Sequence, residues 1–224
     1  MLISCRLTCL FDRVVQIKGG KTKSQYPKGA ETKLRIIQVA ADLFHKQGVR
    51  ATSSDEIIEA SATGKGQFYY YFKSKEGLVH EVLQSHLAAI KNGSAPVNYE
   101  INSWQDLEQW FQAHLELQKR YKMTRGCPFG TVGNELTEND GLIRQDLGHL
   151  FEVVKHKLAM FFVREKAQGR LVKDANEEHL AAFCIATIQG AMLMGKIERD
   201  GQTVEIAFRE ALMHLKRYAV TPKS

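Results

Sequence analysis

The chain has 224 residues and a formal net charge of +6, with 44% hydrophobic and 25% charged residues, as in an ordinary globular protein. That length allows one large domain or two small ones, and either can bury a core. Four cysteines with no CxxC or Cys/His zinc spacing argue against a metal site and a disulfide scaffold, and they predict a reducing cytoplasm.

The positive charge is concentrated near the N-terminus. Residues 1–91 hold 14 Lys and Arg against 8 Asp and Glu, whereas the rest of the chain is balanced. A polyanion would therefore bind the first two-fifths of the chain. No apolar run reaches the length of a membrane span, so no membrane contact is expected. Charged residues interrupt the start, which argues against a signal peptide. Residues 1–17 are either a tail or an over-extended reading frame, and no function is assigned to them.

The chain then reads as a series of helices. Residues 1–30 form a basic N-terminal extension, flexible over the lysine-rich 18–33 stretch. Apolar spacing predicts a helix from Leu34 that stops at Gly48. Ser53-x-x-Glu56 is a capping box that opens a short second helix. Residues 62–64 interrupt it, and Ser74 can cap a further helix that reaches about residue 91.

The pattern stays helical after a loop at 92–96. We expect helices over 104–117, after Pro128, over 142–168, over 176–199 and over 203–218. The predicted fold is all-α with about nine helices. Its domains are the extension 1–30, a helix-turn-helix domain with a connecting helix at 31–91, and a helical ligand-binding and dimerisation domain at 92–224.

The stretch GKGQFYYYFKSKEGL at 64–78 contains five consecutive aromatic residues between lysines. On a helix Phe68 and Phe72 share one face and can close a small core, while Lys65 and Tyr69 share another. Two short helices joined by a tight turn are the layout of a helix-turn-helix, whose second helix enters the DNA major groove. The alternative is an aromatic core with a solvated lysine fringe. Neither nucleotide-binding glycine motif fits the spacing.

Residues 32–83 resemble the N-terminal domain of the TetR family of bacterial transcriptional regulators. The resemblance lies in A-x-x-L-F-x-x-x-G at 40–48, A-T-S at 51–53 and K-G-x-F-Y-x-Y-F-x-S-K-E-x-L at 65–78. It implies a homodimer that binds a palindromic double-stranded DNA operator, and a C-terminal helical domain whose small-molecule effector releases the DNA.

The resemblance also implies the DNA contacts. Lys65, Gln67 and Tyr69 correspond to base and groove contacts, and Gly66 lets the backbone approach the DNA. Contacts to phosphate are expected from Ser54, Tyr70, Tyr71 and Lys75. The sequence departs from the family pattern at three positions. Ala62 replaces the usual turn glycine, Gly64 replaces a capping Ser, and Asp55 stands where some members carry a basic residue.

Two helices near the C-terminus carry stripes of small and apolar residues. The family resemblance implies that the last two helices form a four-helix bundle across a two-fold axis, and these stripes suit it. The alternative is that these stripes pack within one subunit. The stripe residues are Ala181, Ala182, Ala186, Gly190, Ala191 and Gly195, followed by Ala207, Phe208, Ala211, Leu212 and Leu215. The predicted lining of an effector pocket comprises Trp104, Phe111, His114, Phe151 and Phe183.

Cys127 lies in Arg-Gly-Cys-Pro, with Pro128 suited to the first position of a helix. A helix N-terminus and the neighbouring Arg125 would lower the pKa of the thiol and make it reactive. Similar segments occur in a subset of TetR-like regulators, and some members of that subset sense electrophiles or oxidants through a cysteine. The alternative is an inert thiol that packs the turn.

We therefore expect a cytoplasmic, homodimeric transcriptional repressor, with no catalytic residue, cofactor or metal. It would be released from DNA by a small molecule or a thiol-reactive signal. Two alternatives stay open. One is an enzyme that uses Cys127 as a nucleophile, for which no partner motif is present. The other is a basic architectural DNA-binding protein without a sensor, which would spread its charge more evenly.

Overall fold

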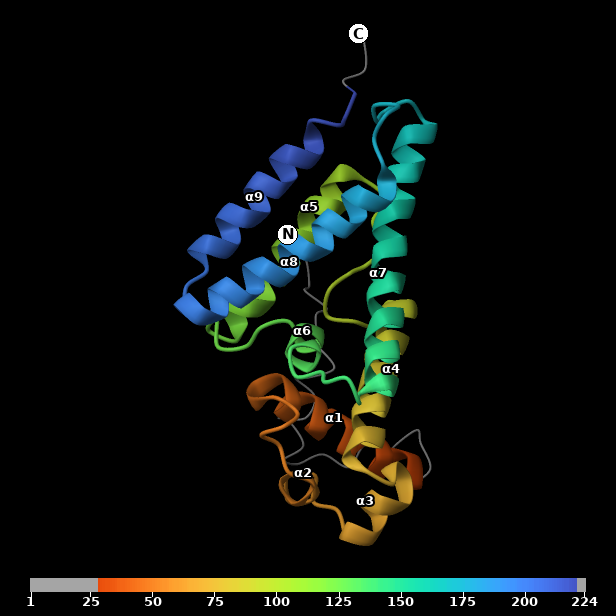
Figure 1. Cartoon of the computed structure of the whole chain (residues 1–224), viewed down its shortest axis with the longest axis vertical. Coiled ribbons are helices and arrows are strands. Elements are labelled where there is room, and N and C mark those ends of the chain that lie inside the picture. Colours follow the sequence, from red (N-terminus) through yellow and green to blue (C-terminus); the bar gives the residue numbers. More distant parts are fainter. Residues whose placement is uncertain (1–27, 221–224) are drawn as a thin grey trace, which may run out of the picture. The chain divides into compact units, whose positions relative to one another are not determined.

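The computed structural model describes residues 28–220, and Figure 1 shows its helices. These residues form nine α-helices and no strand, apart from one isolated antiparallel bridge between Leu171 and Ala219. The all-α prediction is confirmed. The unassigned residues 1–17 and most of the predicted extension lie outside the described residues. Residues 28–30, assigned to that extension, are instead the first turn of a helix.

The chain divides into two compact units, and the first consists of residues 1–96 and 132–146. Within the described residues this unit starts at residue 28, and its helices are α1 (Lys28–Gln47), α2 (Ser54–Ala60), α3 (Lys65–Phe72) and α4 (Lys75–Lys91). Side chains of all four helices form its core, and α1 packs on α2 and α4. The fully buried residues include Ile36, Ile57, Phe68 and Leu78.

Local signals in the sequence set the ends of these helices. Gly48 follows α1 with φ +91°, a conformation that favours glycine. The Ser53 and Ser74 side chains accept hydrogen bonds from the N–H groups of Glu56 and Gly77, and thereby cap α2 and α4. Only half of the predicted capping box forms, because the Glu56 carboxylate accepts from the Gln47 amide instead.

Among the described residues, the second unit consists of 97–131 and 147–220. It contains α5 (Trp104–Arg120), α8 (Glu177–Glu198) and α9 (Gln202–Lys216). α6 (Pro128–Gly133) begins in this unit and ends in the first, whereas α7 (Gly141–Ala167) begins in the first and continues here. α8 packs along α9, and α5 packs on both.

This division differs from the expected domain boundary at residue 92, because residues 132–146 group with the first unit. The His80 Nδ1 atom lies 2.7 Å from an Asp146 carboxylate oxygen, and the Gln84 amide donates to the other oxygen at 2.8 Å. These polar contacts join α4 to the start of α7. Among the described helices, α8 is long and apolar enough to cross a membrane by length and composition. It also packs on α9 and α5, as a core helix does.

Candidate DNA interface and sensor site

Helix α3, the predicted recognition helix, is held by its phenylalanines and exposes Tyr69 and Tyr70. Phe68 and Phe72 are buried at 0% and 3% exposure, and their ring centroids lie 5.6 Å apart. Tyr69 and Tyr70 are 42% and 72% exposed. An isolated helix of eight residues is marginal in water, so the buried rings stabilise it. The i,i+4 spacing thus divides the aromatic run as predicted.

The polar residues at the start of α3 are exposed but have intramolecular partners. The Lys65 ammonium lies 3.5 Å from the Asp55 carboxylate of α2, with both side chains largely exposed. Gln67 Oε1 accepts a hydrogen bond from the Gly64 N–H at 3.2 Å. A Cβ added at Gly66 would meet nothing within 4 Å. To make the predicted DNA contacts, Lys65 and Gln67 would have to give up these partners, whereas the backbone at Gly66 is open to close approach.

The turn before α3 has the backbone that a glycine would favour. Ala62 has φ +49°, in the left-handed region that costs an L-residue free energy. Gly64 precedes α3 and offers no side chain as a cap, so the Gln67 side chain turns back to the Gly64 N–H. Two departures from the family pattern therefore have structural consequences at one turn.

Three predicted phosphate contacts occupy different environments. Ser54 is the half-buried first residue of α2. Tyr71 is half-buried, with its hydroxyl beside Gly29 of α1, where an added Cβ would lie 3.2 Å from the oxygen. The Lys75 ammonium donates to the carbonyls of Val49 and Thr52, both at 3.1 Å. Lys75 thus braces the loop between α1 and α2 and keeps one N–H for a phosphate.

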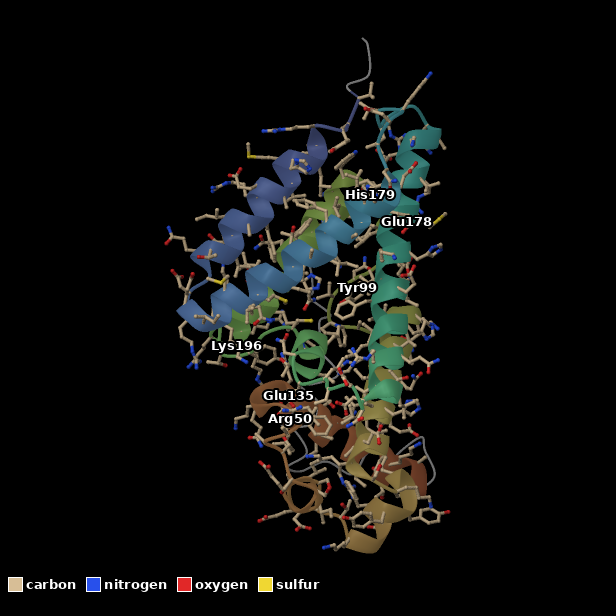
Figure 2. The ribbon with its side chains drawn as sticks, viewed as in Figure 1. Arg50, Tyr99, Glu135, Glu178, His179 and Lys196 are labelled. Carbon is tan, nitrogen blue, oxygen red and sulfur yellow. The ribbon has the colours of Figure 1, made fainter. Side chains whose placement is uncertain are left out.

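A second set of hydrogen bonds that holds the loop between α1 and α2 was not predicted from the sequence. The Glu135 carboxylate accepts from the Arg50 backbone N–H at 2.8 Å, and the Arg50 guanidinium donates to the Glu135 carbonyl at 2.9 Å (Figure 2). A Cβ added at Gly48 would lie 2.0 Å from Glu135 Oε1, so a larger residue there would clash. No local sequence motif predicts a contact between residues that are 85 positions apart.

In the second unit, the predicted pocket residues do not line a single site. Trp104 packs on Phe161 at 5.3 Å between ring centroids, and Phe111 packs on Phe208 at 5.1 Å. Phe111 also lines a groove of about 410 Å³ between α5 and α9. The Phe151 ring contacts Phe129, two residues after Cys127.

Phe183 faces the surface of α8, 37% exposed, and its ring lies 5.1 Å from that of His214 on α9. Its assignment to the lining of an internal pocket does not fit this position. Helical spacing identified an apolar face but did not indicate which of the two apolar faces of α8 lies inside the unit.

Cys127 directly precedes α6, whose first residue is Pro128, as predicted. The expected lowering of its pKa is wrong: burial raises the pKa of the Cys127 thiol. Hydrogen bonds from the Gln189 amide, at 3.3 Å, and from the Gly130 and Phe129 N–H groups only partly oppose that effect. The thiol is therefore predominantly protonated at neutral pH, which reduces its nucleophilicity.

Three polar or aromatic residues near this segment were missed: Tyr99, Gln118 and Gln189. The Tyr99 ring lies 6.5 Å from Trp110 and 6.2 Å from His114, and Figure 2 marks its place in the unit. Gln118 donates to the Gly126 carbonyl, next to Cys127. The signal available in the sequence was Gln118, a polar residue that continues the apolar stripe of α5.

The stripes predicted for dimerisation divide between two faces. On α8, Ala181, Ala191 and Gly195 are buried within the unit, and so are Phe208, Ala211 and Leu215 on α9. The other α8 face exposes Ala182, Ala186 and Gly190. The exposed large apolar residues of these two helices are Phe183, Leu193, Met194, Ile197, Ile206 and Met213.

Two family models match successive parts of the chain. Residues 36–82 match the family described as bacterial regulatory proteins, tetR family, and residues 104–211 match a tetracyclin repressor-like C-terminal domain. A helix-turn-helix-type transcriptional regulator from the lacX 3′ region of Lactococcus lactis is 31% identical over 182 residues. The match covers 79% of this chain and 89% of that protein.

The transcriptional repressor DhaR of a Mycobacterium species is 26% identical over 172 residues, which cover 76% of this chain and 85% of DhaR. Among solved structures, the reduced form of Escherichia coli NemR superposes with a TM-score of 0.67 at 21% identity. That match covers 86% of this chain and all of NemR. At this identity the superposition supports the fold.

Proposed function

Because the chain belongs to the tetR family of bacterial regulatory proteins, we propose that it is a cytoplasmic, homodimeric repressor of transcription. A small molecule or a thiol-reactive compound bound by the second unit would release it from a palindromic operator. The observation that carries this proposal is α3: two buried phenylalanines hold it while Lys65, Gly66, Gln67, Tyr69 and Tyr70 stay exposed.

The exposed groups of α3 suit both kinds of DNA contact. The Lys65 ammonium can bind guanine or a phosphate, and the Gln67 amide can pair with adenine. The Tyr69 and Tyr70 hydroxyls can donate to phosphate oxygens, which fixes the position of the helix on the duplex. Repression, rather than activation, is inferred from relatives such as DhaR and NemR, whose names describe repressors.

The exposed face of α8 and α9 supports the homodimer. Leu193 and Ile197 are 47% and 65% exposed, and they follow the small residues Ala186 and Gly190 on the same face of α8. Small residues permit close approach of helices, and an exposed apolar face of this kind marks an interaction surface. Two copies pairing α8 and α9 would form a four-helix bundle.

We assign no catalysis to Cys127. A half-buried thiol with a raised pKa is a poor resting nucleophile, and its hydrogen bonds come from the Gln189 amide and from backbone N–H groups, none of which is a base. A thiol-reactive signal remains part of the proposal because Cys127 is half-buried. If Cys127 is the sensor, Cys127→Ser will keep operator binding but lose release by thiol-reactive compounds. Unchanged release would remove Cys127 from the account.

The direct test of function is footprinting of the DNA that adjoins the gene. We expect two protected half-sites with centres about 34–36 Å apart, or a multiple of that spacing. A reporter gene downstream of this DNA should be less active when the protein is present. Protection without half-site symmetry would contradict the dimeric repressor, and increased reporter activity would indicate an activator.

A further inference from the structure

One face of α5 carries three buried polar residues at successive turns. Trp110, His114 and Gln118 follow the i, i+4, i+8 spacing and are 2%, 7% and 1% exposed. At 1.5 Å per residue, the row extends about 12 Å along the helix. Helical residues that point into a core are usually apolar, so three polar ones in register need a physical explanation.

Two atoms of this row are buried without hydrogen-bond partners. These atoms are the donor Nε1 of Trp110 and the acceptor Oε1 of Gln118. Within the described residues they are the only buried side-chain nitrogen or oxygen atoms in that condition. Leaving such a group buried and unpaired is unfavourable, and a ligand that supplies the partner recovers the lost free energy.

His114 lies between them and adds a second acceptor. Its Nδ1 lies 2.8 Å from the Trp110 carbonyl, and since a carbonyl only accepts, Nδ1 carries the proton. Nε2 is then a lone-pair acceptor. Burial lowers the pKa of His114 to about 4, so the imidazole stays neutral at physiological pH. In order along α5, the row offers a donor and two acceptors.

The aromatic side chain that packs on the row is also uncharged. The Tyr99 ring packs on Trp110 and His114 from a segment that precedes α5 and has no helix. Burial raises the pKa of the Tyr99 hydroxyl, which therefore stays protonated. Of the two cations near the Gly126 segment, Arg125 stacks on Tyr121 at 4.4 Å, and Lys196 directs its Cδ toward Gly126.

We propose that the Trp110–His114–Gln118 row binds the effector, and that this effector is an uncharged small molecule. It carries an oxygen acceptor for Trp110 Nε1 and O–H or N–H donors for His114 Nε2 and Gln118 Oε1. Displacement of the Tyr99 segment opens the row. This inference rests on the proposed function only where it calls the bound molecule an effector, that is, a molecule that controls DNA binding. Binding to the row itself can be measured without DNA.

Charge complementarity excludes the charged analogues of such a molecule. A carboxylate would lose its hydration and meet the lone pairs of His114 and Gln118, which are acceptors and cannot replace the water that it gives up. An ammonium ion would meet the Trp110 donor and no carboxylate. An ordered water is the other partner that buried polar atoms commonly take. Water would satisfy the atoms but would leave no binding site that a solute can saturate.

The chain has two tryptophans, Trp104 and Trp110, so the fluorescence of Trp110 can report binding once Trp104 is replaced. In a Trp104→Phe background, emission comes from Trp110 alone. The probes are 4-hydroxybenzamide and 4-hydroxyacetanilide, which are neutral, with 4-hydroxybenzoate and 4-hydroxybenzylammonium as anionic and cationic counterparts. We expect a saturable change in emission with a neutral probe, and binding weaker by about tenfold or more for both ions.

Gln118→Leu should weaken binding of the neutral probe by about tenfold, since it removes one acceptor of the row. The matched control is Gln109→Leu, which removes an exposed glutamine of the same helix and should leave binding unchanged. The comparison of probes needs no change in the row, so it decides the proposal even if Gln118→Leu does not fold. Equal or tighter binding of an ion, or no saturable change with either neutral probe, would overturn it.

Probe binding and operator binding, measured on the same samples, distinguish a failure of this proposal from a failure of the proposed function. A neutral probe that binds the row but leaves the operator complex intact supports the site and contradicts its role as the effector site. A protein that binds no operator but shows the expected order of probes contradicts the proposed function alone.

Discussion

Ala62 illustrates at the scale of one residue how a departure from a family pattern is accommodated. Its φ of +49° and exposed side chain mean that the methyl group packs little while the backbone is strained. We predict that Ala62→Gly raises the free energy of unfolding by roughly 1 kcal/mol, because glycine adopts this conformation without steric cost. Equilibrium urea unfolding measures the change.

The matched control is Ala60→Gly at the end of α2, where the same substitution should lower stability by roughly 0.5–1 kcal/mol. If the free energy of unfolding rises in Ala62→Gly and falls in Ala60→Gly, the backbone strain lies at the turn. A loss of stability in both variants would contradict the assignment of strain to Ala62.

Asp55 adds a negative charge to the surface that faces DNA. Its carboxylate lies 3.5 Å from the Lys65 ammonium and competes with phosphate for it. We predict that Asp55→Asn tightens binding to non-specific DNA. The slope of log affinity against log salt should steepen by about 0.9, the value for one additional phosphate contact. Fluorescence anisotropy over a salt series measures both.

Glu59→Gln is the control, since it removes one exposed carboxylate of α2 that has no recorded ion pair with Lys65. A similar change in slope for both variants would show that only net charge matters. A weaker affinity for non-specific DNA in Asp55→Asn would mean that Asp55 does not restrain Lys65.

At the scale of elements, the spacing between α3 and α4 depends on Gly77. A Cβ added at Gly77 would lie 2.2 Å from the Phe72 carbonyl oxygen, and the backbone would have to move. We predict that Gly77→Ala displaces the C-terminus of α3 and weakens operator binding by about tenfold or more, because contacts to bases depend on position. A titration of operator DNA checks it.

Gly148→Ala on α7 is the control, because an added Cβ there meets nothing within 4 Å. It should stabilise the helix by roughly 0.5–1 kcal/mol and leave DNA binding unchanged. Normal operator binding by Gly77→Ala would mean that α3 tolerates a shift away from α4.

The elements themselves were largely predictable because their signals are local. Apolar spacing and the capping residues Ser53 and Ser74 predict these helices because both signals act between residues that are close together in the sequence. The same reasoning could not place the Lys75 ammonium on two loop carbonyls or the Glu135 carboxylate on Arg50. Those contacts depend on which loop comes near which helix.

The candidate effector region shows most clearly what could not be predicted from the sequence. Phe183 and Ala181 lie on the same helix, yet one faces outward and the other inward. Apolar spacing cannot separate them when both faces of α8 are apolar. The lowered pKa expected for Cys127 was wrong because proximity to a helix start was weighed without the burial that the folded unit imposes.

At the scale of the whole molecule, the outer face of α8 should determine the oligomeric state. We predict that Leu193→Glu, which places a carboxylate on that face, yields a monomer and loses operator affinity, since one recognition helix cannot engage both half-sites. Sedimentation and operator titration measure the two effects. The control is Val163→Glu on α7, a comparably exposed apolar residue that should leave the dimer intact. A Leu193→Glu dimer would place the interface elsewhere.

The most direct test of the whole account is the ratio of two dissociation constants at one fixed salt concentration. One is for the DNA upstream of the gene, and the other is for a scrambled duplex of equal length. The account predicts a preference of about 10³-fold or more for the upstream DNA. Tyr69→Ala and Lys65→Ala should each remove it while the protein stays dimeric. A preference below about tenfold in the unaltered protein, or one that survives both substitutions, would contradict α3 as the element that reads DNA.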